Sequence, residues 1–367
     1  MQAYTSTDTD APASHRLTDK PTPAIATKAV LVRVWAFCRQ PVNQKIRYGL
    51  SRYGRYLLPG LLLLAALWLI ACEDHRDSPN AVFPERIEFV AERLYPEGIA
   101  YSAQLDKFLV TSIPLGKIGT VDTDGRYADL LTAPELIAGI GMKVANNRVF
   151  VCNSDAGSST KSTPAGKFQT AELLVFNLNT RQLERRTDLD ALLPAAEPNF
   201  ANDVTLAPDG TAYVTDSSSP VIYKVAPDGT ASILVRDNVR FSSPTFGLNG
   251  IAYHPDGYLI VANTGQGTFY KVDLQRGNAI TEIGGIGALP ADGLTFLNRD
   301  LYIVAADNRV VQVRSTDNWL TASISKIDAT GYVGATTSVA VNNQIYTLNA
   351  RIGENASARD FSIQRFR

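Results

Sequence analysis

A pattern of two short apolar strands recurs six times along residues 86–367, and it constrains the fold more than any other feature. Each copy opens on one residue, continues as an apolar strand, turns, and returns as a second apolar strand. The copies open at six positions: Glu97, Ile140, Asn202, Asn249, Asp292 and Thr337. A repeat of about 40–50 residues with short strands is typical of propeller blades. The sequence therefore predicts an all-β, six-bladed β-propeller of four-stranded antiparallel blades.

Turn chemistry and strand counting support this prediction. Pro-Asp-Gly turns at 208–210 and 255–257 join the first two strands of two copies, and such turns suit tight hairpins. The last copy shows only three strands before the chain reaches Arg367, whereas residues 86–90 alternate like a strand ahead of the first copy. We expect residues 86–90 to supply the outer strand of the last blade, because this closure removes exposed sheet edges.

The repeat also predicts a ring of side chains, because the first strand of each blade lines the central channel. Four of the six opening residues carry an oxygen ligand, namely Glu97, Asn202, Asn249 and Asp292. One Asn or Asp at a strand start is an ordinary turn signal. Two carboxylates and two amides at one repeat position favour a cation, since burying the charges alone is costly. Oxygen ligands favour Ca²⁺, with Mg²⁺, Mn²⁺ or Zn²⁺ as alternatives.

Hairpin pairing predicts a second tier of polar residues, since the second strand ends opposite the start of the first. Asn202 should face Asp216, and Asn249 should face Asn263. We expect Asp216 and Asn263 on the substrate side of the site or behind its ligands. Four further polar residues end their second strands similarly: Thr111, Asn153, Asp307 and Asn349. The Ser- and Gly-rich segment 153–170 follows a second strand, so it should emerge at the end of the channel where the ring of side chains lies. There it would form a surface loop or cover the site.

The N-terminal part of the chain differs from the repeats. Residues 1–56 are predicted to be a basic, largely disordered segment, residues 57–72 an apolar signal or anchor, and residues 73–85 a linker. The apolar run ends Leu-Ile-Ala-Cys at Cys72, which resembles the lipobox of bacterial lipoproteins, whose cysteine is lipidated. We expect an exported, membrane-tethered lipoprotein at the periplasmic face, outer membrane or cell surface. An uncleaved N-terminal anchor helix is the alternative.

Charge and residue usage argue against several functional classes. The net charge of −1 does not suit a nucleic-acid binder. A Gly-x-Ser-x-Gly elbow is absent, and His254 is expected to be a surface turn residue, so a Ser-His triad is disfavoured. Cys152 lies in a strand pattern and is expected to be a buried, inert thiol. We expect a monomer whose partners are a small molecule and a membrane.

Four dipeptides, one per blade, resemble the metal site of the SMP-30/gluconolactonase family of six-bladed propellers, which is related to paraoxonase and diisopropyl-fluorophosphatase. They are, in chain order, Glu97-Gly98, Asn202-Asp203, Asn249-Gly250 and Asp292-Gly293. The resemblance implies a divalent cation held by Glu97, Asn249 and Asp292. It also implies catalytic roles for Asp292, as general base, and for Asn202, which would hold substrate or water.

One position departs from the family pattern. In sugar-lactone members an Arg commonly precedes the first Asn by two residues, and here Phe200 stands at that position. The departure favours a more apolar substrate on the same side of the site. The sequence thus predicts a divalent-metal-dependent hydrolase of a lactone or ester.

Two other interpretations of the propeller stay open. One is a non-catalytic binding module for a glycan, peptide or envelope partner, with a structural cation in its channel. The other, a strictosidine-synthase-like propeller, is weaker because such proteins do not rely on this quartet.

Overall fold

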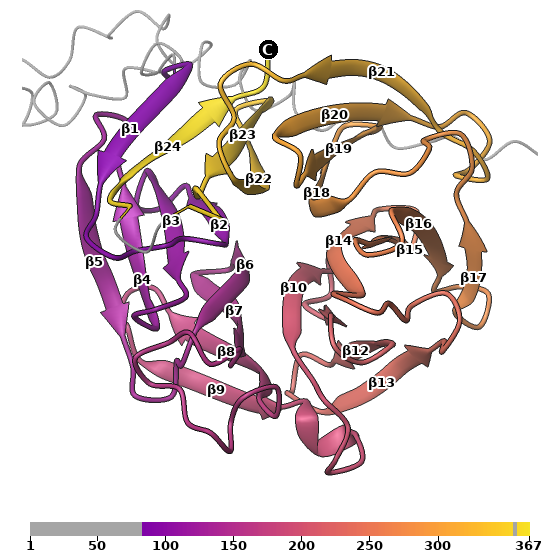
Figure 1. Cartoon of the computed structure of the whole chain (residues 1–367), viewed down its shortest axis with the longest axis horizontal. Coiled ribbons are helices and arrows are strands. Elements are labelled where there is room, and N and C mark those ends of the chain that lie inside the picture. Colours follow the sequence, from indigo (N-terminus) through magenta and orange to yellow (C-terminus); the bar gives the residue numbers. More distant parts are fainter. Residues whose placement is uncertain (1–82, 355–357) are drawn as a thin grey trace, which may run out of the picture. The chain divides into compact units, whose positions relative to one another are not determined.

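The computed structural model describes residues 83–354 and 358–367, so the interpretations of residues 1–82, including Cys72, lie outside it. The described residues form six four-stranded sheets arranged around a channel (Figure 1). Every hydrogen-bonded strand pair is antiparallel within these residues, which confirms the predicted six-bladed propeller. No helix in this part of the chain is both long and apolar enough to span a membrane.

The first three blades follow the chain from the channel outwards. Blade 1 contains β2 (Ile99–Ser102), β3 (Lys107–Ser112), β4 (Lys117–Val121) and β5 (Tyr127–Thr132). Blade 2 contains β6 (Gly139–Ala145), β7 (Arg148–Ser154), β8 (Ala171–Asn177) and β9 (Leu183–Asp188), which the 3-10 helix η1 (Asp190–Leu192) follows. Blade 3 contains β10 (Ala201–Leu206), β11 (Ala212–Asp216), β12 (Val221–Val225) and β13 (Ala231–Arg236).

The remaining blades follow the same order, except that the last one combines both ends of the propeller. Blade 4 contains β14 (Leu248–His254), β15 (Tyr258–Asn263), β16 (Thr268–Asp273) and β17 (Ala279–Glu282). Blade 5 contains β18 (Ala291–Leu297), β19 (Asp300–Ala305), β20 (Arg309–Arg314) and β21 (Ser323–Asp328). Blade 6 contains β22 (Ala335–Val341), β23 (Gln344–Asn349), β24 (Asp360–Arg365) and β1 (Arg86–Val90).

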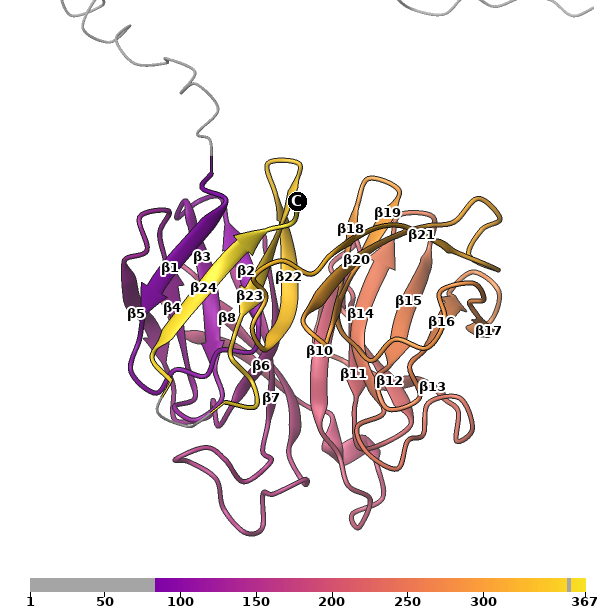
Figure 2. The ribbon, with the colours of Figure 1, turned by 45° about the horizontal axis from the view of Figure 1, so that its top comes forward.

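Strand β1 closes the propeller as predicted. It pairs antiparallel with β24, from Arg86 opposite Gln364 to Val90 opposite Asp360, and Figure 2 shows the two strands side by side. We call the face at which the inner strands begin the mouth. Because β24 runs away from the mouth, β1 runs towards it. The chain therefore enters the propeller on the face opposite the mouth, where Phe83 packs against aromatic rings of blades 1 and 6.

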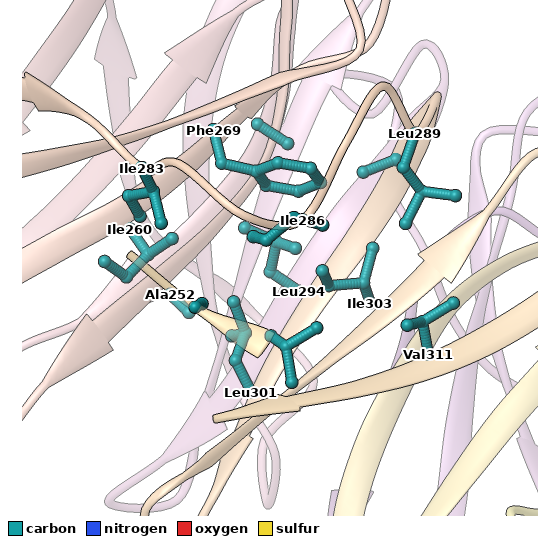
Figure 3. Close-up of a cluster of buried hydrophobic side chains, with 14 of the residues drawn as sticks. Ala252, Ile260, Phe269, Ile283, Ile286, Leu289, Leu294, Leu301, Ile303 and Val311 are labelled. Atoms are coloured by element: carbon teal, nitrogen blue, oxygen red, sulfur yellow. The ribbon is translucent and has the colours of Figure 1, made fainter. Parts of the chain in front are cut away.

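The hydrophobic core lies between neighbouring blades. Each inner strand contacts the inner strands on both sides, from β2 through β22 and back to β2. Figure 3 shows the cluster between blades 4 and 5, where Phe269 and Ile260 meet Leu294 and Ile303. Burying each such side chain contributes about 1.5–3 kcal/mol, so blade-to-blade packing holds the ring closed. The sequence led us to expect His254 as a surface turn residue. It instead ends β14, and its ring stacks on that of Tyr258.

Candidate metal and substrate site at the mouth

Five of the six opening residues line one cavity of about 300 Å³ at the mouth, and four of them are polar: Glu97, Asn202, Asn249 and Asp292. Each belongs to a different blade, so only the closed propeller brings them together. Ile140 adds an apolar side chain to the same cavity. At the sixth blade the cavity is lined by Thr336 rather than by Thr337, whose hydroxyl is buried.

A β-bulge near the start of the inner strand, in every blade except blade 1, explains how Asn202, Asn249 and Asp292 are aimed. In blade 3, Ala201 pairs with Asp216 and Val204 with Val214, so Asn202 and Asp203 together oppose Thr215. The extra residue bends the strand and redirects its side chains. Blades 2, 4, 5 and 6 show the same register shift.

The bulge corrects the predicted second tier. Asp216 faces Ala201 instead of Asn202, and Asn263 faces Leu248 instead of Asn249. Alternation along a regular hairpin cannot anticipate an inserted residue, which is why the predicted register was wrong by one.

The second-tier side chains hold backbone segments at the mouth. The Asp216 carboxylate accepts hydrogen bonds from the backbone of Phe200, 2.9 Å away, and of Ser218 and Ser219. The Asn263 amide donates to the carbonyls of Arg240 and Ser242. Both residues therefore fix loops beside the cavity, and among the described residues neither lines it.

In blades 1, 2, 4 and 5 the residue after the opening residue is glycine, because the next blade approaches its Cα. A Cβ on Gly98 would lie 2.3 Å from the Ile140 carbonyl oxygen, and one on Gly250 would lie 2.4 Å from that of Asp292. Both distances are shorter than a side chain can tolerate. The glycines therefore set the spacing between neighbouring ligand-bearing strands.

Blade 3 has Asp203 where blades 1, 2, 4 and 5 have glycine. This buried carboxylate accepts hydrogen bonds from the backbone of Val204 at 2.8 Å and of Ile251, in blade 4, at 3.3 Å. It therefore ties two inner strands together just beneath the ring. The sequence analysis did not select Asp203 for the site, although its departure from the glycine of the other copies was visible.

Hydroxyl groups interlock the blades at the ring, and sequence reasoning selected only Thr111 among them. Thr111 donates to the Ile140 carbonyl at 3.1 Å, and Thr215 donates to the Asn249 carbonyl at 2.5 Å. Ser217 donates to the Leu248 carbonyl and accepts the amide of Asn202 at 2.8 Å. Further bonds of this kind come from Ser154 and Thr264. The sequence signal that could have identified these hydroxyl groups is an Asx-Ser or Asx-Thr pair at the end of the second strand in three blades.

Burial makes the mouth electrostatically unusual. Desolvation, followed by repulsion from Asp292 and Asp203, raises the pKa of Glu97 well above its usual range. Desolvation also raises the pKa of Asp292, where a hydrogen bond from Asn249 acts in the opposite direction. Lys143 on β6 partly offsets the charge repulsion at Glu97. The ionised forms of both carboxyl groups are therefore unfavourable at the mouth unless a cation compensates their charge.

Cys152 lies behind this site and is fully buried. Desolvation raises the pKa of its thiol well above the usual range. Because the thiolate is the nucleophilic form, this environment suits the inert residue expected from the sequence.

The donor set fits a hard divalent cation. The oxygens Glu97 Oε2 and Asn202 Oδ1 are buried and have no hydrogen-bond partner in the part of the chain that the structure describes. Such orphaned oxygens are costly unless an ion or water satisfies them. Within residues 83–354 and 358–367, no cluster of three or more His, Cys, Asp or Glu side chains is close enough to hold a metal. A cation at the mouth would therefore need the amide oxygens as well as the two carboxylates.

The segment 153–170 forms part of the same cavity. Ala156 and Ser158 line it together with Phe200 and Phe246. The predicted position at the mouth is therefore correct, and the segment forms a side wall of the cavity.

A known protein family matches most of the propeller. Residues 95–324 match the family model described as the SMP-30/Gluconolactonase/LRE-like region. Among curated proteins, no sequence matches this chain.

Solved structures with the same fold are distant in sequence. The major allergen Mala s 1 of Malassezia sympodialis shares 17% identity and a TM-score of 0.62, covering 77% of this chain and 96% of the allergen. Regucalcin from Agrobacterium tumefaciens, a calcium-binding protein, shares 17% identity and a TM-score of 0.55, covering 77% and 94%. A putative gluconolactonase shares 17% identity and a TM-score of 0.54, covering 77% and 93%.

Proposed function

This chain belongs to the SMP-30/gluconolactonase/LRE-like family, and on that premise we propose that it is a divalent-metal-dependent hydrolase of a lactone or ester. The observation that carries the proposal is the pair of orphaned buried oxygens, Glu97 Oε2 and Asn202 Oδ1, in one cavity with Asn249 and Asp292. Such oxygens need a bound ion or water, and the carboxylate and amide oxygens around them suit a hard cation.

Glu97, Asn249 and Asp292 would hold the cation, and Ca²⁺ suits their hard oxygen atoms best. When bound, the cation supplies Lewis-acid polarisation of the substrate carbonyl and stabilises the developing oxyanion. The Thr336 hydroxyl donates to the Glu97 carbonyl at 2.7 Å, and Thr215 holds the Asn249 carbonyl, so the backbone behind two of these residues is fixed. Preorganised groups of this kind need no rearrangement during the reaction.

Asp292 would take the proton of the attacking water while the water oxygen bonds to the carbonyl carbon. The same proton then passes to the alkoxide oxygen as the carbon–oxygen bond of the lactone or ester breaks, so the reaction consumes one water. A general base works best when its pKa is close to the working pH, and desolvation raises the pKa of Asp292 in that direction. Asn202, whose amide is held by Ser217, keeps its oxygen free for water or substrate.

The test is hydrolysis of a panel of lactones and aryl esters by the purified full chain, before and after EDTA and with Ca²⁺, Mg²⁺, Mn²⁺ or Zn²⁺ restored. We expect EDTA to abolish turnover and Asp292→Asn to lower kcat at least about a hundredfold. Asp328→Asn is the matched control, because Asp328 is a buried Asp at the end of an outer strand and does not line the mouth cavity. Full activity in EDTA together with an active Asp292→Asn variant would contradict the metal mechanism.

Turnover of no substrate, with EDTA still lowering the melting temperature, would instead favour the binding module with a structural cation. Calorimetric titration with Ca²⁺ separates these outcomes from a protein that binds no cation at all.

We further propose that the propeller is exported and tethered to a membrane through Cys72 or through an anchor helix at 57–72. The support is the lipobox-like sequence that ends at Cys72. Membrane fractionation tests this proposal. Cys72→Ala should release the protein if the cysteine carries the lipid and should leave it membrane-bound if the helix is the anchor.

A further inference from the structure

We propose that the mouth cavity is a subsite for an apolar substituent of the substrate, and that the segment 155–169 is its fixed wall. The inference rests on the proposed hydrolase function and names its substrate class: lactones or esters carrying a short alkyl or aryl group. The polar quartet occupies one part of the cavity, and the rest of its lining is almost entirely apolar.

Aromatic rings form one side of this subsite. Phe200 and Phe246 meet edge to face, with centroids 5.5 Å apart, and Phe168 packs against Phe200 at 6.3 Å. At the rim, Phe246 is 41% exposed and Ile352 is 42% exposed, although both line the cavity. Exposed apolar side chains that converge on a cavity indicate an apolar ligand. Apart from the quartet, the polar side chains that line the described cavity are those of Ser158 and Thr336, and no charged or amide side chain joins them to bind a set of sugar hydroxyls.

The segment 155–169 is held in place by a latch at Lys161. The Lys161 ammonium donates to three backbone carbonyls, those of Gly116 at 3.0 Å, Ala133 at 2.7 Å and Leu136 at 2.8 Å. These bonds use all three donors of the ammonium group. Ser159 adds a bond of 2.6 Å to the Ile137 carbonyl. The segment is thereby bound to the loops of blade 1 beside the cavity.

Hydrogen bonds also fix the two ends of the segment 155–169. The Asp155 carboxylate accepts hydrogen bonds from Ser162 at 2.5 Å and from the backbone of Gly157 at 2.7 Å. Phe168 donates its backbone N–H to the Asp155 carbonyl and accepts one from Asn199, next to Phe200. Ala156 and Ser158 are therefore presented to the cavity as a wall whose position is set before any ligand arrives.

The cavity volume sets the size of the substituent. At the roughly 30 Å³ that one water occupies in the liquid, 300 Å³ corresponds to about ten water-sized groups. A five-membered lactone ring with its carbonyl oxygen uses about six of them, which leaves room for a side chain of about four carbons.

The experiment measures binding without turnover, so that it does not depend on the reaction. Five-membered lactams with alkyl side chains of increasing length replace the lactones, and calorimetry in Ca²⁺ buffer gives Kd for the full chain. We expect Kd to fall by about fourfold per methylene, up to about four carbons, and then to level off or rise. A polyhydroxylated lactam of similar size should bind more weakly than the alkyl ones.

Phe246→Ala tests the aromatic side. It should weaken binding of the four-carbon lactam by about tenfold and leave the unsubstituted lactam within about twofold. Phe366→Ala is the matched control, because Phe366 packs edge to face on Tyr302 at the opposite end of the propeller. It should change neither value.

A Kd that does not change with the length of the alkyl side chain, or that is lower for the polyhydroxylated lactam, would overturn the proposed subsite. Neither result would contradict the proposed hydrolysis. Length-dependent lactam binding without hydrolysis of any lactone or ester would support the subsite and refute the proposed reaction. Equal effects of Phe246→Ala and Phe366→Ala would also overturn the subsite, because the loss would then reflect general destabilisation.

Discussion

Substituting Gly250 with alanine should damage the proposed metal site without altering any proposed ligand. The new Cβ would lie 2.4 Å from the carbonyl oxygen of Asp292, whereas ordinary contact begins at 3.4 Å. Strands β14 and β18 would therefore have to separate by about 1 Å, while metal–ligand distances tolerate changes of only about 0.2 Å. Asn249 and Asp292 lie on these two strands, so their oxygens would no longer reach one cation together.

The expected magnitudes follow from that movement. Overpacking against backbone should cost about 1–3 kcal/mol, which lowers the melting temperature of a domain of this size by about 2–10 °C. Displaced supporting geometry should weaken Ca²⁺ binding at least about tenfold. Calorimetric titration and thermal unfolding, each with and without Ca²⁺, measure both effects.

Gly284→Ala is the matched control for Gly250→Ala. A Cβ at Gly284 would lie 3.6 Å from the nearest side chain, which is ordinary contact, and the residue is exposed. This variant should keep both Ca²⁺ affinity and melting temperature. Wild-type Ca²⁺ affinity in Gly250→Ala would refute the conclusion that blade spacing sets the site, even if the variant were less stable.

Three further predictions concern charge, the latch and closure. In EDTA, protonated Asp292 stabilises the fold below a pH of about 4, and this stability should be lost as the pH rises through the raised pKa of Asp292. The melting temperature of Asp292→Asn should therefore exceed that of wild type by more at pH 8 than at pH 5. A difference that does not change with pH would refute this prediction. Lys161→Met should cost about 2 kcal/mol and expose the segment 155–169 to limited proteolysis, whereas Lys167→Met, at an exposed position, should do neither. Ile87→Ala should cost about 2–4 kcal/mol in thermal unfolding because β1 closes the ring; Val90→Ala, at a residue that is 60% exposed, should cost under about 0.5 kcal/mol, and equal losses would contradict closure by β1.

Much of the fold was predictable because its signals are local and repeated. Blade number followed from the spacing of one pattern, and the pairing of β1 with β24 followed from counting strands. The wrong register at Asp216 and Asn263 has an equally specific cause. A bulge adds one residue to the inner strand, and the alternation of apolar residues in the sequence does not indicate where a bulge lies.

The sequence by itself determined which residues open each blade, and therefore that Glu97, Asn202, Asn249 and Asp292 share one level of the channel. A repeat position is a one-dimensional property, and the symmetry of the propeller converts it into a position in space. Only the tertiary structure decided what surrounds the quartet. The blade-locking hydroxyls, the carboxylate of Asp203 and the wall latched by Lys161 all act through contacts between segments distant in sequence. Such contacts depend on loop paths and side-chain directions that no local pattern specifies.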